Sequence, residues 1–211
     1  MIRLFSYKLT HDTGFAPNPF WGILTLATCK PRIRLSKRKG DWIAGFTSQT
    51  LCGDPVGEEK LVYLMEVGDK LSFSDYFNSP PYKKKIPDLR KSQGIFVAGD
   101  NIYRPTSPAP SLVNNFEQLE NPYHGESNKQ RDLSGKFVLA SSKFFYFGRE
   151  ALNIPPNIRP NIPKGQSANG NQTHDETAAL KFIEYIVSKY AVGIHGAPHS
   201  WPHNDASWKM K

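Results

Sequence analysis

Four side chains of this sequence could take part in bond-making chemistry: His11, Asp12, Cys29 and His124. Cys29 is followed directly by Lys30, and a cation beside a thiol favours the thiolate, which is the nucleophilic form of cysteine. His11 and Asp12 are neighbours in a loop, where they could act as a general base and its partner. His124 shares another loop with Asp132, and either could serve as a general acid or base. The structural alternatives are a buried cysteine at a strand end and polar residues that form turns.

A second group of side chains could bind a base or a nucleotide: Asn18, Trp42, Asp100, Asn101 and Tyr103. An aromatic ring can stack on a base, and an Asn or Asp side chain can hydrogen-bond to a base edge. Asn18 belongs to the loop 11–20, which is interrupted by glycine and proline. Loops of this kind present polar groups from a rigid scaffold, although turn formation explains the same residues equally well.

The segment 30–39 has the highest density of positive charge in the chain. Six of its ten residues are cations, namely Lys30, Arg32, Arg34, Lys37, Arg38 and Lys39. Alternate residues of an extended chain face one side, so the first three would form a basic face that could contact a phosphate backbone. The segment 83–91 adds a second basic cluster. A solvated hairpin is the structural alternative.

The whole chain is basic, with 27 Lys and Arg residues against 19 Asp and Glu residues and a formal charge of +8. Such a balance favours anionic partners, while charge that serves only solubility is the alternative. We therefore expect a nucleic acid, DNA rather than RNA, or a nucleotide as the partner. The oligomeric state is left open.

Several classes of protein are not indicated. The two cysteines have neither disulfide-framework nor zinc-site spacing, and His195, His199 and His203 lie among residues, including Gly196, Pro198 and Pro202, that exclude a helix. No metal site is therefore predicted, and the cofactor stays unknown. The sequence contains no Walker loop, no G-x-G-x-x-G motif and no G-x-S-x-G motif. Nucleoside triphosphate hydrolases, dinucleotide-binding Rossmann folds and α/β-hydrolases are therefore not indicated. Neither an apolar run of about 18 residues nor a signal-peptide pattern occurs, so we expect a cytoplasmic protein without a membrane span.

The elements that hold these residues can be predicted from short apolar segments, which indicate a mainly β fold. The predicted strands cover residues 2–8, 22–28, 42–46, 61–67, 71–73, 94–98, 136–140 and 144–147. One amphipathic helix is predicted over 175–190, with Thr173 and Glu176 as a capping box and Gly193 as the stop. A short helix is predicted to begin at 74–77, and 105–135 is predicted to be a long functional or mobile loop.

Many short strands with few helices are typical of a compact β-barrel, here with one helix packed on it. The run Lys37-Arg38-Lys39-Gly40-Asp41-Trp42-Ile43 resembles a segment of the small barrels of the pseudouridine-synthase-and-archaeosine-transglycosylase (PUA) type. We predict a barrel domain over 1–153, a Pro- and Asn-rich linker over 154–174, and a C-terminal helix and tail over 175–211 packed on the barrel.

Five strings of the sequence resemble one bacterial and phage family. They are His11-Asp12-Thr13-Gly14-Phe15-Ala16-Pro17-Asn18, the segment Leu24 to Arg34, Gly40-Asp41-Trp42-Ile43-Ala44-Gly45, Gly99-Asp100-Asn101-Ile102-Tyr103 and Phe144-Phe145-Tyr146-Phe147-Gly148. The family is the second of the nucleotide-modification-associated domain families, and the resemblance covers about residues 1–155. It implies an association with systems that hypermodify DNA bases or contend with such bases, and it assigns no catalytic residue.

Three functional hypotheses follow. The leading one is a binding module that takes a modified or flipped base into an aromatic and polar pocket. The alternative is an enzyme that modifies a DNA base or nucleotide, with His11 and Asp12, and also Cys29 and His124, as acid, base or nucleophile. The third is a defence or stress component whose basic face binds another protein.

Overall fold

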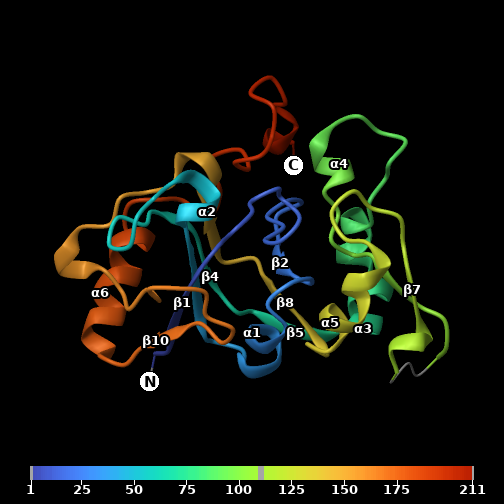
Figure 1. Cartoon of the computed structure of the whole chain (residues 1–211), viewed down its shortest axis with the longest axis horizontal. Coiled ribbons are helices and arrows are strands. Elements are labelled where there is room, and N and C mark those ends of the chain that lie inside the picture. The colour runs from blue at the N-terminus through green and yellow to red at the C-terminus, as the bar shows by residue number, and fades with distance from the viewer. Residues whose placement is uncertain (1, 109–111, 211) are drawn as a thin grey trace.

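A six-stranded sheet forms the larger part of the molecule. The computed structural model describes residues 2–108 and 112–210, and its main sheet is mixed, with parallel and antiparallel neighbours (Figure 1). In spatial order its strands are β10 (Asn171–Thr173), β1 (Leu4–Lys8), β3 (Trp42–Phe46), β4 (Leu61–Glu66), β9 (Phe144–Tyr146) and β11 (Gly193–Ile194). The pairs β1–β3 and β9–β11 are parallel, and the other neighbours are antiparallel.

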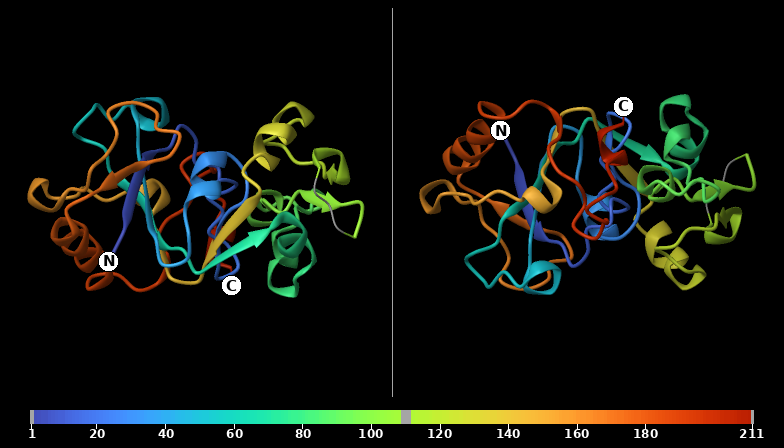
Figure 2. Two further views of the ribbon diagram at one scale, coloured as in Figure 1. Left: turned by 90° about the horizontal axis from the view of Figure 1, so that it is seen from below. Right: turned by 90° about the horizontal axis from the view of Figure 1, so that it is seen from above.

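Two smaller sheets continue from the first. One has the order β2 (Leu24–Leu26), β8 (Phe137–Ser141) and β5 (Asp69–Ser72), and the other pairs β6 (Tyr103–Pro105) with β7 (Phe116–Gln118). Seen from below and above, the main sheet occupies one end of the molecule and the segment from α3 to α5 occupies the other (Figure 2).

Helices are short apart from the last one. They are α1 (Pro31–Ser36), α2 (Gln49–Cys52), α3 (Phe73–Asn78), α4 (Gly94–Val97), α5 (Lys129–Leu133) and α6 (Glu176–Val187). Short segments of 3-10 helix are η1 (Pro80–Lys85), η2 (Val113–Asn115), η3 (Glu126–Asn128), η4 (Gly148–Glu150), η5 (Pro156–Ile158) and η6 (Ser207–Lys209). No helix within the described residues is long and apolar enough to cross a membrane.

The main sheet is buried on both faces. Along β3, Trp42, Ala44 and Phe46 face one core cluster, while Ile43 faces another, as the alternation of a strand requires. Helix α6 covers the first face with the predicted apolar stripe, and Phe182 of that stripe is fully buried. Asp175 is its N-cap, since the carboxylate accepts from Thr177 N–H and Ala178 N–H, so the predicted capping box at Thr173 and Glu176 is wrong.

The prediction of a sheet-based fold is confirmed, but the PUA-like barrel is not. Within the described residues the strands form separate sheets and do not close into a barrel. The barrel was inferred from many short strands, and strand number alone does not decide whether the first and last strands pair.

Two predicted extended segments are helical. Residues 31–36 form α1, where Pro31 occupies the first turn that proline favours, and residues 94–97 form α4 instead of a strand. The three cations expected on one face of the first segment therefore separate. Arg32 is exposed, while Arg34 is fully buried.

The segment 154–174 is tied to the main sheet. Its end forms β10, which pairs with β1, and Arg159 donates to the carboxylate of Glu59 at 2.6 Å. Lys8 lies 2.5 Å from the same buried carboxylate and also donates to the carbonyl of Lys164 at 3.0 Å. This segment therefore contributes to the sheet edge and its ion pairs.

The close approach of β3 and β4 generates a stability prediction at Gly45. A Cβ at this position would lie 2.2 Å from Cε1 of Tyr63 and 2.6 Å from Cδ1 of Leu9. We expect Gly45→Ala to lower the free energy of unfolding by about 1–3 kcal/mol because the added methyl overpacks the core. Denaturant titration measures the change. Gly165→Ala is the control, since no atom lies within 4 Å of its Cβ, and equal stability of the two variants would contradict the packing described.

Candidate active site

A cavity of about 310 Å³ lies between three segments of the chain: residues 7–16, residues 26–34 and residues 122–124. Its wall contains aromatic rings, including Phe15 and Tyr123, whose centroids are 4.9 Å apart. Its size is at the lower end of the range for small-molecule sites. The cavity therefore brings together loops that are more than ninety residues apart in sequence.

Cys29 lies in this wall, at a turn between β2 and α1. Cys29 and the next residue, Lys30, both have left-handed backbone conformations, with φ of 55° and 35°. Such values are uncommon in residues with a Cβ and persist only where the surroundings impose them. The strand–turn–helix junction holds the sulfur at the cavity, which is the placement that a nucleophile requires.

Cys29, His124 and Asp132 form a hydrogen-bonded line. The Sγ of Cys29 lies 3.4 Å from Nε2 of His124, and Nδ1 of His124 lies 2.6 Å from Oδ2 of Asp132. The other carboxylate oxygen of Asp132 accepts from the backbone N–H of Cys29 at 2.9 Å. A nucleophile, a base and a carboxylate that orients the base are the components of covalent acyl-transfer catalysis.

The charges of this line suit a thiolate nucleophile. Burial opposes the charged ring, but the hydrogen bonds with Asp132 and Cys29 raise the pKa of His124 to about 9. Burial likewise favours the neutral acid at Asp132, but the bonds with His124 and Tyr103 hold the pKa of this carboxyl below its usual value. A ring that carries a proton near neutral pH therefore faces the sulfur at 3.4 Å, and a cation beside a cysteine in general favours the thiolate.

Two buried side chains fix the ends of the line. The hydroxyl of Tyr103 donates to Oδ2 of Asp132 at 2.9 Å, and burial raises the pKa of this tyrosine, so the proton stays on. Arg34 donates to three carbonyl oxygens, those of Cys29, Asp132 and Phe137, at 3.0, 2.6 and 2.8 Å. Burial lowers the pKa of Arg34 to about 10, which leaves it charged at neutral pH. This residue thus joins the turn of Cys29 to the segment that carries Asp132.

Two polar side chains, Thr28 and Lys30, flank Cys29 in the cavity wall. The hydroxyl of Thr28 is buried in the cavity wall and has no hydrogen-bond partner within the described residues. Lys30 is half-buried, its ammonium donates to Gln166 at 2.7 Å, and burial lowers its pKa. A buried hydroxyl without a partner is costly, and a bound molecule would satisfy it.

Of the four predicted catalytic residues, the structure brings Cys29 and His124 together and places His11 in the same cavity wall. Asp12 is fully buried and lies in a different group, in which it accepts from Tyr146 OH at 2.5 Å and from His199 N–H at 3.1 Å. His11 and Asp12 therefore do not form the expected pair within hydrogen-bonding distance. Their catalytic role stays a prediction.

Most of the predicted base-binding side chains are buried and partnered. Asn18 donates to the carbonyl of Ala98 at 2.7 Å and accepts from the ammonium of Lys85 at 2.6 Å. Asp100 accepts from Thr25 and Tyr76, and Asn101 donates to the carbonyls of Tyr76 and Tyr82. Trp42 belongs to the core beneath α6, and Tyr103 binds Asp132. These contacts hold the scaffold together, and base binding by these residues stays a prediction.

The predicted phosphate-binding residues divide into buried and exposed ones. Arg34 binds carbonyl groups as described, and the ammonium of Lys37 lies 3.6 Å from the ring centroid of Phe5. Arg32, Arg38 and Lys39 are exposed, and Lys39 lies 3.3 Å from the carboxylate of Asp69. Phosphate binding by the exposed members stays a prediction.

Within the described residues no group of three or more His, Cys, Asp or Glu side chains could hold a metal ion.

The sequence indicated Asp132 only as a possible acid or base in the loop of His124, and it gave no signal for Thr28. The contact between Asp132 and the backbone of Cys29 spans 103 residues, and no local pattern encodes it. The usable signal was the presence of one His and one Asp in a long polar loop, which is where catalytic residues concentrate.

The comparison with known protein families identifies one family for this chain. The family model described as nucleotide modification associated domain 2 matches residues 1–205. The chain belongs to this family. Membership of the nucleotide modification associated domain 2 family confirms the predicted resemblance and associates the protein with nucleotide modification, which indicates a nucleic acid or a nucleotide as the partner. The match extends to residue 205, so the expectation that the resemblance ends near 155 is wrong. No curated protein and no solved structure matches the chain.

The geometry of the line predicts the reactivity of Cys29. At pH 6.5 the ring of His124, with a pKa near 9, is protonated and stabilises the thiolate, so iodoacetamide should alkylate Cys29 at least about tenfold faster than in His124→Gln. The rate is measured by mass spectrometry of the peptide that carries Cys29.

Cys52 is the internal control for this measurement. Its thiol donates to Asp54, and burial together with that carboxylate raises the pKa of Cys52, so it should react slowly in both proteins. Equal rates at Cys29 with and without His124 would mean that the imidazolium does not activate the sulfur.

Proposed function

We propose that this protein is a cysteine-dependent enzyme of nucleotide modification, which forms and resolves a covalent acyl intermediate on Cys29. The observation that carries the proposal is the continuous line from Sγ of Cys29 through His124 to Asp132. A simple binding module has no need of a nucleophile held at a strained turn beside an imidazolium.

The reaction proceeds in two steps. The thiolate attacks the carbonyl carbon of an amide or ester, the bond to the leaving group breaks, and the proton on His124 passes to the leaving group. This step leaves a thioester on Cys29 and a neutral imidazole. Water, or another nucleophile with a removable proton, then attacks the thioester while His124 accepts its proton, and the thiolate is released. Asp132 holds the ring in place and stabilises its charge.

The substrate class follows from the family and from the cavity wall. The family association favours a nucleotide or a nucleic-acid base, and the rings of Phe15 and Tyr123 offer an aromatic wall for a base. A flipped or modified base that carries an amide or ester would place its carbonyl carbon beside Cys29. Recognition of a modified base, expected from the sequence as the leading hypothesis, is in this account the binding step of a reaction.

Thr28 provides a prediction that separates substrate binding from activation of the nucleophile. Its unpartnered hydroxyl would donate to the carbonyl oxygen of the substrate as negative charge develops there. We expect Thr28→Val, which keeps the shape, to lower kcat by about tenfold to a hundredfold while the alkylation rate of Cys29 stays unchanged. Loss of alkylation in this variant would show instead that Thr28 supports the turn.

The covalent intermediate gives the direct test of the proposal. Nucleotides and oligonucleotides whose bases carry amide or ester groups are mixed with the protein and quenched in acid, and the peptide mass at Cys29 is measured. We expect an acyl adduct on Cys29 that is absent from Cys29→Ser and present in Cys52→Ser. Turnover of such a substrate by Cys29→Ser at the wild-type rate would overturn the proposal.

A further inference from the structure

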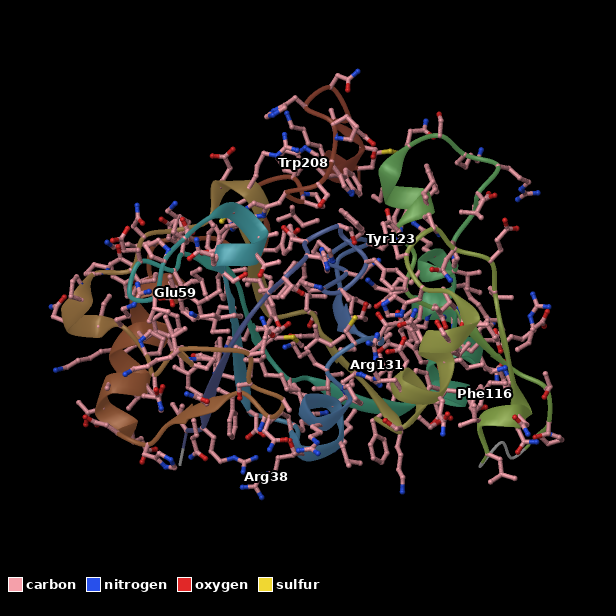
Figure 3. All side chains as sticks on the ribbon, viewed as in Figure 1. Arg38, Glu59, Phe116, Tyr123, Arg131 and Trp208 are labelled. Carbon is pink, nitrogen blue, oxygen red and sulfur yellow. The ribbon has the colours of Figure 1, made fainter. Side chains whose placement is uncertain are left out.

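A surface groove away from Cys29 combines exposed aromatic rings with lysines. It consists of two hollows of about 950 and 590 Å³, which have Trp21 and Met210 as common wall residues. The groove lies where the C-terminal tail approaches the end of the molecule that holds α4, and Figure 3 shows Trp208 on that tail. No residue of the groove takes part in the line from Cys29 to Asp132.

Three half-buried rings occur along this groove, and each has a lysine above it. The ammonium of Lys84 lies 5.1 Å from the ring centroid of Trp21, and that of Lys209 lies 5.3 Å from Trp208. Lys91 lies 5.9 Å from Phe96, whose ring is 5.5 Å from that of Trp21. Trp21 and Phe96 are thus in contact with each other, and Trp208 lines the same hollow as Trp21.

The charge of the larger hollow is positive. Four cations line it, namely Lys83, Lys84, Arg90 and Arg104, against the carboxylates of Asp88 and Glu120. Asp88 is paired with Arg90 at 2.8 Å and Arg104 with Glu117 at 3.2 Å, so the excess positive charge comes from Lys83 and Lys84, whose side chains are exposed. An anionic partner with flat rings fits this combination of charge and aromatic surface.

We propose that this groove binds a single-stranded nucleic acid, with bases stacked on Trp21, Phe96 and Trp208 and phosphates near the lysines. Stacking on aromatic rings beside cations is the general mode of binding an unpaired strand without a sequence code. A base pair within a duplex does not expose its face to such rings, so an unpaired strand fits better than a duplex. The proposal rests on the proposed function and names its substrate as a strand instead of a free nucleotide.

The groove and the cavity are lined by neighbouring stretches of the chain, although no residue lines both. Residues 13–16 line the cavity and Trp21 of the same loop lines the groove, while Leu119 and Glu120 line the groove just before Pro122–His124 line the cavity. In this proposal a strand held in the groove extends toward the cavity, where one base would reach Cys29. Trp208 and Tyr123, both labelled in Figure 3, pack against the same core cluster of Phe20, Ile95, Ala98 and Trp201.

The backbone at Trp21 adds an independent observation. Trp21 and Gly22 have φ of 61° and 74°, so a bulky aromatic residue adopts a conformation that favours glycine. The fold maintains this conformation through the neighbouring core, where Phe20 stacks on Trp201 with centroids 5.1 Å apart. Backbone strain at a side chain that is presented to a groove is typical of binding positions.

Fluorescence anisotropy with end-labelled strands tests the groove. The probes are oligothymidylate, oligouridylate and a DNA duplex, each of about 20 nucleotides, titrated over a series of NaCl concentrations. We expect the single strands to bind more tightly than the duplex, and the preference between the first two distinguishes DNA from RNA. Trp21→Ala should weaken binding by about tenfold or more, and Lys84→Ala should lower the salt slope by about one.

The control variant is Lys189→Ala. Lys189 lies 3.9 Å from the ring centroid of Tyr185 on α6, at the other end of the molecule, and its removal should leave binding unchanged (Figure 1). Lys84 is exposed, so its variant tests the groove even if Trp21→Ala fails to fold.

Equal binding of duplex and single strand, or affinities that do not change in either groove variant, would overturn the proposal. If no strand binds while nucleotides still acylate Cys29, the groove proposal is wrong and the proposed function stands. If a strand binds but no acyl adduct forms on Cys29, the groove proposal stands and the proposed function is wrong.

Discussion

The buried carboxylate of Asp132 connects the parts of the molecule on which the candidate site depends. It accepts hydrogen bonds from the backbone of Cys29 and from the hydroxyl of Tyr103, and it orients His124. These partners come from the turn after β2, from β6 and from the loop after β7. Because the carboxylate is fully buried, each bond compensates for the loss of water around its charge. Nucleophile, base and scaffold are therefore held by one group.

The surrounding fold supplies the rigidity that this arrangement needs. Arg34 ties the turn of Cys29 to the carbonyls of Asp132 and Phe137, and β8, which begins at Phe137, pairs with β2 on one side and β5 on the other. A second buried group, Lys85 with Asn18, fixes the loop that forms another wall of the cavity. Burial lowers the pKa of Lys85 to about 8 because the charged ammonium is less stable away from water. The hydrogen bonds of this ammonium join η1 to the loop of Asn18.

Local patterns predicted the elements better than their assembly. Most predicted strands occur, including β3 and β4, and the apolar stripe of α6 packs as expected, because alternation and helical periodicity are local properties. The prediction of an extended chain in the segment 30–39 was wrong. Alternating cations suggested extended structure, whereas Pro31 begins a helix that buries Arg34. The candidate site could be derived from the sequence only in part, and its function stays a prediction. Cys29 and His124 were candidates, but their contact and the role of Asp132 depend on a long-range hydrogen-bond network that no sequence spacing encodes.

The protonation of His124 is the most direct measure of whether this network activates the sulfur. Nitrogen NMR of the ring, assigned by comparison with His124→Gln, follows the charge as the pH is raised. The account predicts a pKa near 9 in the wild-type protein, so that both ring nitrogens carry a proton at neutral pH, and a clear decrease in Asp132→Asn. A His124 ring that is already neutral at pH 7 in the wild-type protein would contradict the proposed imidazolium–thiolate pair.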